Sequence, residues 1–203
     1  MAVEITEEFV WQNIPPRARD SHKGTFGSVL AVAGSAFYRG AALLAAEGAL
    51  RTGAGIVTLA SVEPVVSAAV TRLPECCLCP CKEGAQGGIA PENVSLLRRQ
   101  KATVLLLGPG LGGTAQSAAR ATETRTLVQQ LGQVGIPLSV MPNAGYPVVT
   151  RTQVKYQGRP EYFAGELGRL AAEGTVQILG GCCGTTPAHI AALRAELDSP
   201  PVV

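Results

Sequence analysis

The chain has 203 residues, of which 46% are hydrophobic and 16% charged, so it can bury a sizeable core and is not an intrinsically disordered chain. Its formal net charge of +2 provides no electrostatic attraction for nucleic acid or for an anionic membrane. The N-terminus lacks a signal-peptide pattern, and no apolar run is long enough to span a bilayer. We therefore expect a soluble cytoplasmic protein with reduced cysteines, contacting neither nucleic acid nor membrane.

Apolar strands and helix-compatible segments alternate through the first half of the chain. Pro74 and Pro80 bracket a cysteine-rich strand and place it at a sheet edge, because proline cannot donate to a central ladder. The elements predicted here are a capping helix over 4–13, a strand over 28–34, a helix over 39–51, a strand over 56–60, a short helix over 65–71, the edge strand over 75–81 and a helix over 91–100.

The apolar run Val104–Leu107 is followed directly by a glycine-rich turn. Four consecutive apolar residues are typical of a strand buried on both faces at the centre of a parallel sheet. The turn GPGLGG, residues 108–113, precedes a helix that begins after Thr114. Backbone amides and the positive end of a helix dipole point the same way there, so the sequence predicts an anion cradle.

The second half continues the alternation and completes an α/β fold. Its predicted elements are a helix over 114–131, a strand over 137–141, a loop with a small hairpin over 146–158, a helix over 160–173, a strand over 176–180 and a helix over 187–197. We expect residues 1–203 to form a single three-layer α/β/α domain with a doubly wound, mostly parallel sheet. The expected strand order is the flavodoxin-like or Rossmann-like 2-1-3-4-5, with the cysteine strand as an extra edge strand.

Two motifs in residues 1–115 carry a resemblance: HKGTFGSVLAVAGSAFYRGAALLAAEGALRTGAGIVTLAS, over 22–61, and GPGLG, over 108–112. They resemble the N-terminal half of the ADP- or ATP-dependent NAD(P)H-hydrate dehydratases, of the ribokinase-like superfamily. The resemblance implies a hydrated-nicotinamide site lined by Gly34, Ser35, Tyr38, Gly40 and Ala41. It also places Gly108, Gly110 and Gly112 near the nucleotide phosphates.

The second half of that family carries a G-x-G-D segment, whose amides hold phosphate and whose aspartate acts as acid or base. This sequence contains no G-x-G-D. Without it the γ-phosphate lacks an anion hole and a proton donor or acceptor, so we expect no intact dehydratase activity.

Residues 116–198 carry a second resemblance, in the motifs PLSVMPNAGYP, PEYFA and ILGGCCGTTPAHI. They are similar to the C-terminal part of the homocysteine S-methyltransferase domain, a TIM barrel. The resemblance implies that Cys182 and Cys183 bind zinc together with a third cysteine at the end of an earlier strand, and that zinc activates the homocysteine thiol. At the position of that third cysteine this chain carries the glycine-rich turn, so we expect only adventitious zinc binding.

The two resemblances meet near residues 108–116, at a strand–loop–helix joint that both folds share. We interpret the chain as an engineered fold chimera, with a ribokinase-like fragment over 1–115 and a TIM-barrel-derived fragment over 116–203. This interpretation predicts no intact activity and no required cofactor, with residual binding of phosphate, sulfate, ADP or ATP at the strand ends. The alternatives are a lyase that dehydrates NAD(P)H hydrate and a zinc-dependent methyltransferase remnant. Sheet surface left uncovered predicts self-association into a homo-oligomer.

The glycine turn also matches the dinucleotide pattern G-x-G-x-x-G through Gly108, Gly110 and Gly113. That pattern requires an acidic residue at the end of the following strand to bind the ribose, and this strand ends at Asn143. We therefore interpret the glycines as the requirement of a tight turn, with adventitious phosphate or sulfate binding there.

The remaining polar candidates have simpler interpretations. Alternation along a strand points Cys77, Cys79 and Cys81 one way and Cys76 the other, which favours packing over a metal site. Surface positions are expected for His22, Lys23, Glu47 and His189.

Overall fold

The computed structural model describes residues 6–14, 16–111, 126–144, 147–150, 153–156, 158–174 and 176–198. The first half contains α1 (Glu7–Asn13), the 3-10 turn η1 (Lys23–Phe26), β1 (Ser28–Val32), α2 (Arg39–Arg51), β2 (Ile56–Val62), α3 (Glu63–Arg72), β3 (Cys77–Cys81), the 3-10 turn η2 (Pro91–Asn93), α4 (Val94–Arg98) and β4 (Val104–Leu107). The second half contains helical residues 126–132, β5 (Leu138–Val140), β6 (Pro147–Val149), β7 (Val154–Tyr156), α6 (Pro160–Ala172), β8 (Ile178–Leu179) and α7 (Pro187–Asp198).

Six parallel strands form the central sheet, in the order β3-β2-β1-β4-β5-β8. This confirms the predicted order, including the cysteine strand at the edge beside the second strand. β1 pairs with β2 on one side and with β4 on the other, so that Val32 lies between Ala60 and Leu107. Because the strands run in one direction, their carboxyl ends meet at one edge of the sheet, where open α/β sheets bind ligands.

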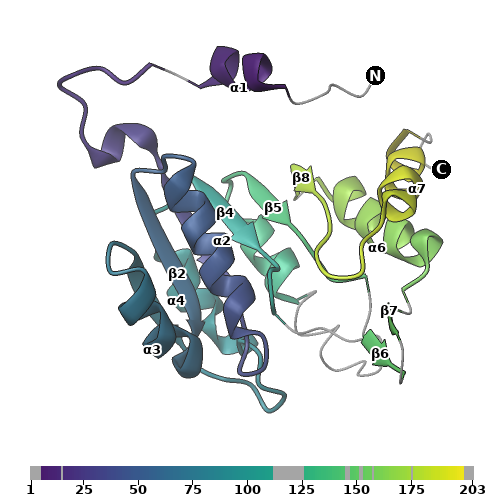
Figure 1. The fold of residues 1–203 in the computed structure, drawn as a ribbon. Helices are drawn as coiled ribbons and strands as arrows, with labels where there is room; N and C mark the ends of the chain where they lie inside the picture. The colour runs from purple at the N-terminus through teal and green to yellow at the C-terminus, as the bar shows by residue number, and fades with distance from the viewer. Residues whose placement is uncertain are drawn as a thin grey trace.

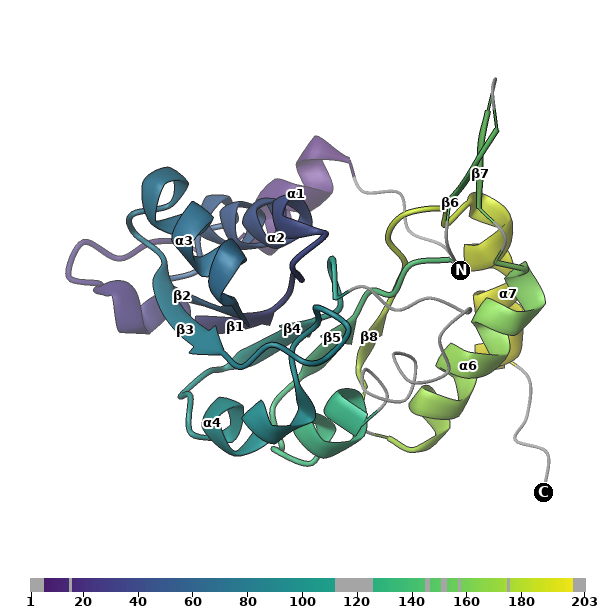
Figure 2. The ribbon, with the colours of Figure 1, turned by 90° about the horizontal axis from the view of Figure 1, so that it is seen from below.

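Helices cover both faces of this sheet (Figure 2). α2 and α3 lie on one face, and α4 and the helical residues 126–132 lie on the other. At the far end of the sheet, α6 and α7 pack against each other beside β8 (Figure 1). The expected three-layer α/β/α architecture is therefore confirmed. Across the described ranges, no helix combines the length and the apolar character needed to cross a membrane.

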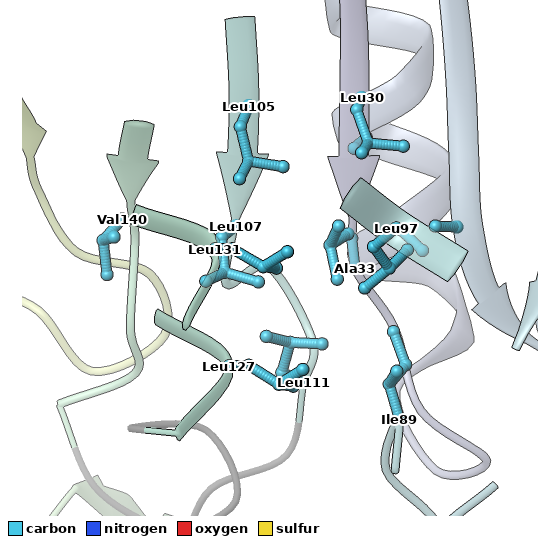
Figure 3. Close-up of a cluster of buried hydrophobic side chains, with 14 of the residues drawn as sticks. Leu30, Ala33, Ile89, Leu97, Leu105, Leu107, Leu111, Leu127, Leu131 and Val140 are labelled. Atoms are coloured by element: carbon cyan, nitrogen blue, oxygen red, sulfur yellow. The ribbon is translucent and has the colours of Figure 1, made fainter. Parts of the chain in front are cut away.

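A leucine-rich part of the core fills the space between the sheet and the layer formed by α4 and residues 126–132 (Figure 3). Its leucines are each at most 2% exposed: Leu30, Leu97, Leu105, Leu107, Leu127 and Leu131. Full burial of such a side chain contributes about 1.5–3 kcal/mol to folding. Since aromatic residues make up only 4% of the chain, leucine packing replaces them here.

β4 differs from the expectation of a strand buried on both faces. Leu105 and Leu107 are buried, whereas Val104 and Leu106 are only half-buried. The cause is the position of the helices on the second face, because α2 and α3 pack on β1, β2 and β3 rather than on β4.

Most other element boundaries also differ from the predicted ones, usually by one or two residues. The helix expected over 91–100 begins as a 3-10 turn, where the buried Asn93 amide bonds the backbone N–H and C=O of Lys82, each at 2.9 Å. The last strand is shorter than 176–180 and comprises Ile178–Leu179. Of the helix expected over 114–131, residues 126–132 are helical and 112–125 lie outside the described residues. The small hairpin is confirmed, because β6 and β7 pair antiparallel.

The central leucines provide a test of this core. Leu105→Ala should lower the free energy of unfolding by about 2–5 kcal/mol, because it removes a buried side chain and leaves a cavity. Equilibrium urea denaturation measures this change. The matched control is Leu44→Ala on α2, where the side chain is 66% exposed and the expected change is within about 0.5 kcal/mol. Equal effects of the two substitutions would contradict this packing.

Candidate functional site

The chain leaves β1 through a turn that only glycine can make. Gly34 has φ +83°, in the left-handed region. A Cβ at this position would lie 2.8 Å from Ala42 Cβ and 2.9 Å from the buried Ser61 Oγ. The Gly34 N–H donates a hydrogen bond to the Pro109 carbonyl at 2.7 Å. This bond ties the turn after β1 to the glycine turn after β4.

The turn after β4 requires glycine for the same reason. Gly108 has φ +133° and Gly110 has φ +69°. A Cβ at Gly108 would lie 2.8 Å from the Met141 carbonyl oxygen, and one at Gly110 would lie 2.7 Å from the Tyr38 carbonyl oxygen. The Gly108 N–H donates to the Val32 carbonyl at 3.3 Å. The two glycine motifs, which are far apart in sequence, therefore form one continuous backbone surface.

The N-terminus of α2 opens onto this surface. Tyr38 is the N-cap residue of α2, but its side chain makes no capping hydrogen bond to the helix. The Tyr38 N–H donates to Ser35 Oγ at 3.3 Å. Ala41 lies against the turn, 2.8 Å from the position of a Cβ at Gly110. Apart from the backbone of its own helix and its chain neighbours, no atom of the described residues lies within 4 Å of the position of a Cβ at Gly40, and Gly40 itself is exposed, so this end of the helix is open. Helix amides and dipole at such an end fit a phosphate group.

A third segment, the loop 84–88, packs beside the other two. The Ala36 N–H donates to the Gly87 carbonyl at 2.8 Å. Gly87 has φ +78°, and a Cβ there would lie 2.8 Å from Phe37 Cε2. The Phe37 ring thus lies on glycine backbone at the rim of the site and is 69% exposed. No local pattern in the sequence predicted this pairing, because the two loops meet only through the fold.

The structure brings most of the expected binding residues to one place at the carboxyl edge of β1 and β4. These residues are Gly34, Ser35, Tyr38, Gly40, Ala41, Gly108 and Gly110. Gly112 and the last part of the glycine turn lie outside the described residues. Which ligand each residue contacts stays a prediction.

The cysteine pair lies further along the same edge, after β8. The Cys182 N–H donates to the Pro142 carbonyl at 2.8 Å, and the Cys183 N–H donates to Asn143 Oδ1 at 3.2 Å. These bonds hold the pair against the turn that follows β5. The two Sγ atoms are 4.0 Å apart, with Cys182 half-buried and Cys183 exposed.

Cys182 and Cys183 could provide two thiolate ligands to a soft metal ion. Burial raises the pKa of the Cys182 thiol, which disfavours the thiolate that a metal requires. Among the described residues, no group of three or more His, Cys, Asp and Glu side chains gathers at one point. Zinc binding by Cys182 and Cys183 stays a prediction.

Three of the β3-region cysteines pack in the core, as predicted. Cys76, Cys79 and Cys81 are buried, and burial raises the pKa of the Cys81 thiol to about 12. Cys77, which the strand alternation placed on the same side as Cys79, is exposed because it begins the edge strand.

His189 corrects the expectation of a solvated surface residue. It is 5% exposed, and its ring nitrogens lie 2.8 Å from Thr186 Oγ1 and 3.0 Å from the Gly158 carbonyl oxygen. The ring also packs edge-on against Phe163, at a centroid distance of 5.5 Å. The chain before α6 folds over the start of α7, a contact that the sequence around His189 does not reveal.

The other polar candidates lie on the surface, as expected. His22 caps η1 by accepting a hydrogen bond from the Gly24 N–H at 3.1 Å. Glu47 pairs with Arg72 at 2.9 Å and Arg51 at 2.8 Å, and the hydrogen bonds from these two guanidinium groups hold the pKa of its carboxyl below the usual range. Lys23 is exposed.

Two family models match the chain. The model described as NAD(P)H-hydrate dehydratase matches residues 29–132, and the model described as homocysteine S-methyltransferase matches residues 88–197. Each covers just over half of the 203 residues. The chain therefore belongs to the NAD(P)H-hydrate dehydratase family through its first segment and to the homocysteine S-methyltransferase family through its second.

Individual relatives agree with these matches. The ADP-dependent (S)-NAD(P)H-hydrate dehydratase of Listeria monocytogenes is 39% identical over 111 residues, which are 54% of this chain and 37% of that protein. The Streptococcus pneumoniae enzyme of the same name is 36% identical over 113 residues, 55% of this chain and 36% of that protein. The methionine synthase of Mycobacterium tuberculosis is 48% identical over 62 residues, 30% of this chain and 5% of that protein. The chain thus spans little more than a third of the length of the Listeria monocytogenes and Streptococcus pneumoniae dehydratases.

Solved structures show the same fold. The ADP/ATP-dependent NAD(P)H-hydrate dehydratase of Bacillus subtilis, co-crystallized with ATP/Mg2+, has a TM-score of 0.55 at 28% identity, over 72% of this chain and 48% of that one. A ribokinase-like superfamily protein of Enterococcus faecalis has a TM-score of 0.58 at 18% identity, over 96% of this chain and 63% of that one. The fold of the chain is therefore like that of these two proteins.

These relatives overturn the interpretation of the chain as an engineered chimera without intact activity. Dehydratases at 36–39% identity over about half the chain point to an enzyme family and not to a designed protein that lacks a function. The missing G-x-G-D segment does not outweigh the match of residues 29–132 to an enzyme family.

The glycine turns provide a second test. Gly110→Ala should lower the free energy of unfolding by at least about 1–2 kcal/mol, because the left-handed backbone strains an L-residue and the new Cβ overlaps the Tyr38 carbonyl. The control is Gly48→Ala in α2, where Gly48 is exposed and no described residue outside its own helix lies within 4 Å of the Cβ position, so the expected effect is a gain of about 0.5–1 kcal/mol. Urea denaturation of both variants measures the difference, and a neutral Gly110→Ala would refute the turn geometry.

The cysteines provide a third test, in the order of their reaction with a maleimide reagent at about pH 8. Cys77 should be modified well before Cys81, because Cys77 is exposed whereas Cys81 is buried with a raised pKa. Peptide mass spectrometry after timed labelling measures the order. Cys77→Ser should remove the early modification of the β3 peptide, and Cys81→Ser should leave it unchanged. Early labelling of Cys81 in the folded protein would contradict its burial.

Proposed function

We propose that this chain acts in the ADP- or ATP-dependent dehydration of NAD(P)H hydrate, and that the joined glycine turns bind the ligands. The observation that carries the proposal is the continuous surface made by the turns after β1 and β4. It consists of close backbone at Gly34, Gly108 and Gly110, next to the open end of α2. The family match and the dehydratase relatives support the ligand class.

Phosphate recognition follows from the local electrostatics. The first amides of α2 carry the positive end of the helix dipole, and the open position at Gly40 admits a group with several oxygen atoms. In the proposed arrangement, loop 34–41 receives the hydrated dinucleotide and the turn after β4 receives the nucleotide phosphates. Glycine at these positions lets the ligand approach the backbone closely.

The solved Bacillus subtilis relative was co-crystallized with ATP/Mg2+, and in the proposed arrangement the nucleotide would bring Mg2+ to this chain as well. Mg2+ in nucleotide sites is held mainly by phosphate oxygens and water, with one or two carboxylates. We therefore assign ATP–Mg2+ to the turn after β4 and no separate metal cage to the protein. When bound, the ion would neutralise phosphate charge, while the glycine backbone of the chain orients the phosphates.

Chemistry on the hydrate needs proton transfer as the hydroxyl group leaves. The sequence has no G-x-G-D segment to provide the acid or base. General acid–base catalysis contributes about 10²–10⁴-fold, so we expect turnover that is slower than that of a protein carrying this motif. Binding through the glycine turns and the N-terminus of α2 does not require that aspartate and should be retained.

The test separates binding from turnover. Purified protein is unfolded thermally alone and with ADP, ATP plus Mg2+, or NADH, and is assayed for nucleotide-dependent recovery of NADH absorbance from hydrated NADH. We expect a stabilisation of about 2.7 kcal/mol for a ligand at about 100 times its Kd, and recovery of absorbance only with ADP or ATP. An unshifted midpoint with every ligand would overturn the binding site, and a shift without recovery would overturn the dehydratase activity.

A charge placed at the open helix end tests the position of the site. Gly40→Glu should weaken ADP or NADH binding at least about fivefold, because the carboxylate repels phosphate by about 1 kcal/mol at 4 Å in water. Gly48→Glu adds the same charge to the same helix, away from its N-terminus, and should leave the binding constant unchanged. Isothermal titration calorimetry compares the two variants, and equal binding would place the phosphate elsewhere.

A further inference from the structure

Phe37 is an exposed aromatic residue at the edge of the candidate site. In the described part of the chain it has the largest exposed fraction of any large apolar side chain, at 69%. It lies in loop 34–41, between the end of β1 and the start of α2, and not on the outer face of a helix. An aromatic ring in this position gains free energy when a second apolar or planar group covers it.

The backbone around Phe37 is held on both sides. Before it, the Ala36 N–H donates to the Gly87 carbonyl at 2.8 Å, and after it, the Tyr38 N–H donates to the Ser35 carbonyl at 3.2 Å. One side of the Phe37 ring also lies over Gly87, because Cε2 is 2.8 Å from the position of a Cβ there. A ring on backbone that is already fixed loses little conformational entropy when a ligand binds to it.

Arg39 is a cation at the end of α2 where a helix disfavours one. It is the first residue of that helix and is exposed, whereas the positive end of the helix dipole is stabilised by negative charge. Its Nε donates to the Ala36 carbonyl at 3.0 Å, which orients the guanidinium group. The ion pairs among the described residues do not include Arg39, so its two Nη atoms are left for an anion.

The aromatic ring and the guanidinium group are close enough to contact one nucleotide. Phe37 and Arg39 are two residues apart, so their Cα atoms are separated by at most about 7 Å. Next to them, Gly40 leaves the first amides of α2 open. Planar bases stack on aromatic side chains, and phosphate groups bind both to the fork of a guanidinium group and to a helix N-terminus.

We propose that Phe37 and Arg39 form an adenylate subsite, in which Phe37 stacks on an adenine ring and Arg39 binds a phosphate group attached to the same nucleoside. The proposal rests on the proposed function, because the dinucleotide and ADP or ATP are the ligands that carry this chemistry. The dinucleotide is the source that the proposed arrangement places at loop 34–41. Both residues position the ligand and take no part in proton transfer.

Substitution of the ring tests the stacking by isothermal titration calorimetry. Phe37→Ala should weaken NADH binding about 5- to 150-fold, and Phe37→Tyr, which keeps an aromatic face, should bind as the parent does. Reduced nicotinamide mononucleotide lacks adenine and should bind the parent and Phe37→Ala equally. The matched control is Tyr162→Ala on α6, where the side chain is 57% exposed and NADH binding should not change.

Substitution of the cation tests the phosphate contact. Arg39→Gln should weaken NADH binding about tenfold or more and make it less sensitive to salt, while Arg39→Lys should restore the salt sensitivity but only part of the affinity. A purely structural role of Arg39 would leave the salt dependence unchanged and would overturn its part in the subsite.

The ligands separate this proposal from the proposed function. If Phe37→Ala and Arg39→Gln weaken ADP binding and leave NADH binding unchanged, the adenylate subsite is confirmed with ADP or ATP as its source. If the parent binds NADH and ADP and both variants bind them equally well, the subsite is overturned and the proposed function stands. A parent chain that binds neither nucleotide would overturn both.

Discussion

The hydrogen bond from the Gly34 N–H to the Pro109 carbonyl, at 2.7 Å, joins the two halves of the candidate site. It forms because β1 and β4 are adjacent parallel strands whose ends lie at the same height. The backbone can approach this closely only where side chains are missing, and each of Gly34, Gly108 and Gly110 has a positive φ together with a Cβ position already occupied by a neighbour. The glycine motifs are therefore first a requirement of packing, and the ligand surface is built from the backbone that this packing exposes.

Much of the fold could be predicted because its signals are local. The helix expected over 39–51 is found at those residues, since its Ala- and Leu-rich segment is bounded by glycines. The strand order followed from the alternation of strands and helices, and the edge position of β3 from two prolines. The signals that failed depend on contacts between distant segments. His189 is buried because it contacts Gly158 and Phe163. The Phe37 ring is placed by its contact with the backbone at Gly87. Neither partner can be identified from local sequence.

The incorrect functional interpretation has a structural explanation as well. The two family matches overlap over residues 88–132, which contain α4, β4 and the glycine turn. A strand, a turn and a helix in this order recur in both ribokinase-like sheets and β/α barrels, so the segment satisfies both families. Because the two resemblances meet at this shared unit, the sequence alone suggested that parts of two enzymes are joined there. In the structure β4 pairs in register with both β1 and β5, so the sheet is continuous across that position, as the predicted single sheet requires.

Continuity of the sheet also explains why the glycine surface and the cysteine pair lie along one edge. All six strands are parallel, so every loop after a strand reaches the same side, whichever family its sequence matches. Met141, directly after β5, connects the two regions. The Met141 backbone lies against the position that a Cβ at Gly108 would occupy. The Met141 Sδ lies against the position that a Cβ at Gly180, just before the cysteines, would occupy. A change of side chain at Met141 would therefore act on the space beside Gly180, whereas the Met141 backbone, which limits the space at Gly108, would be kept. Cys182 and Cys183 are separated from the glycine turns by this residue and the turn after it.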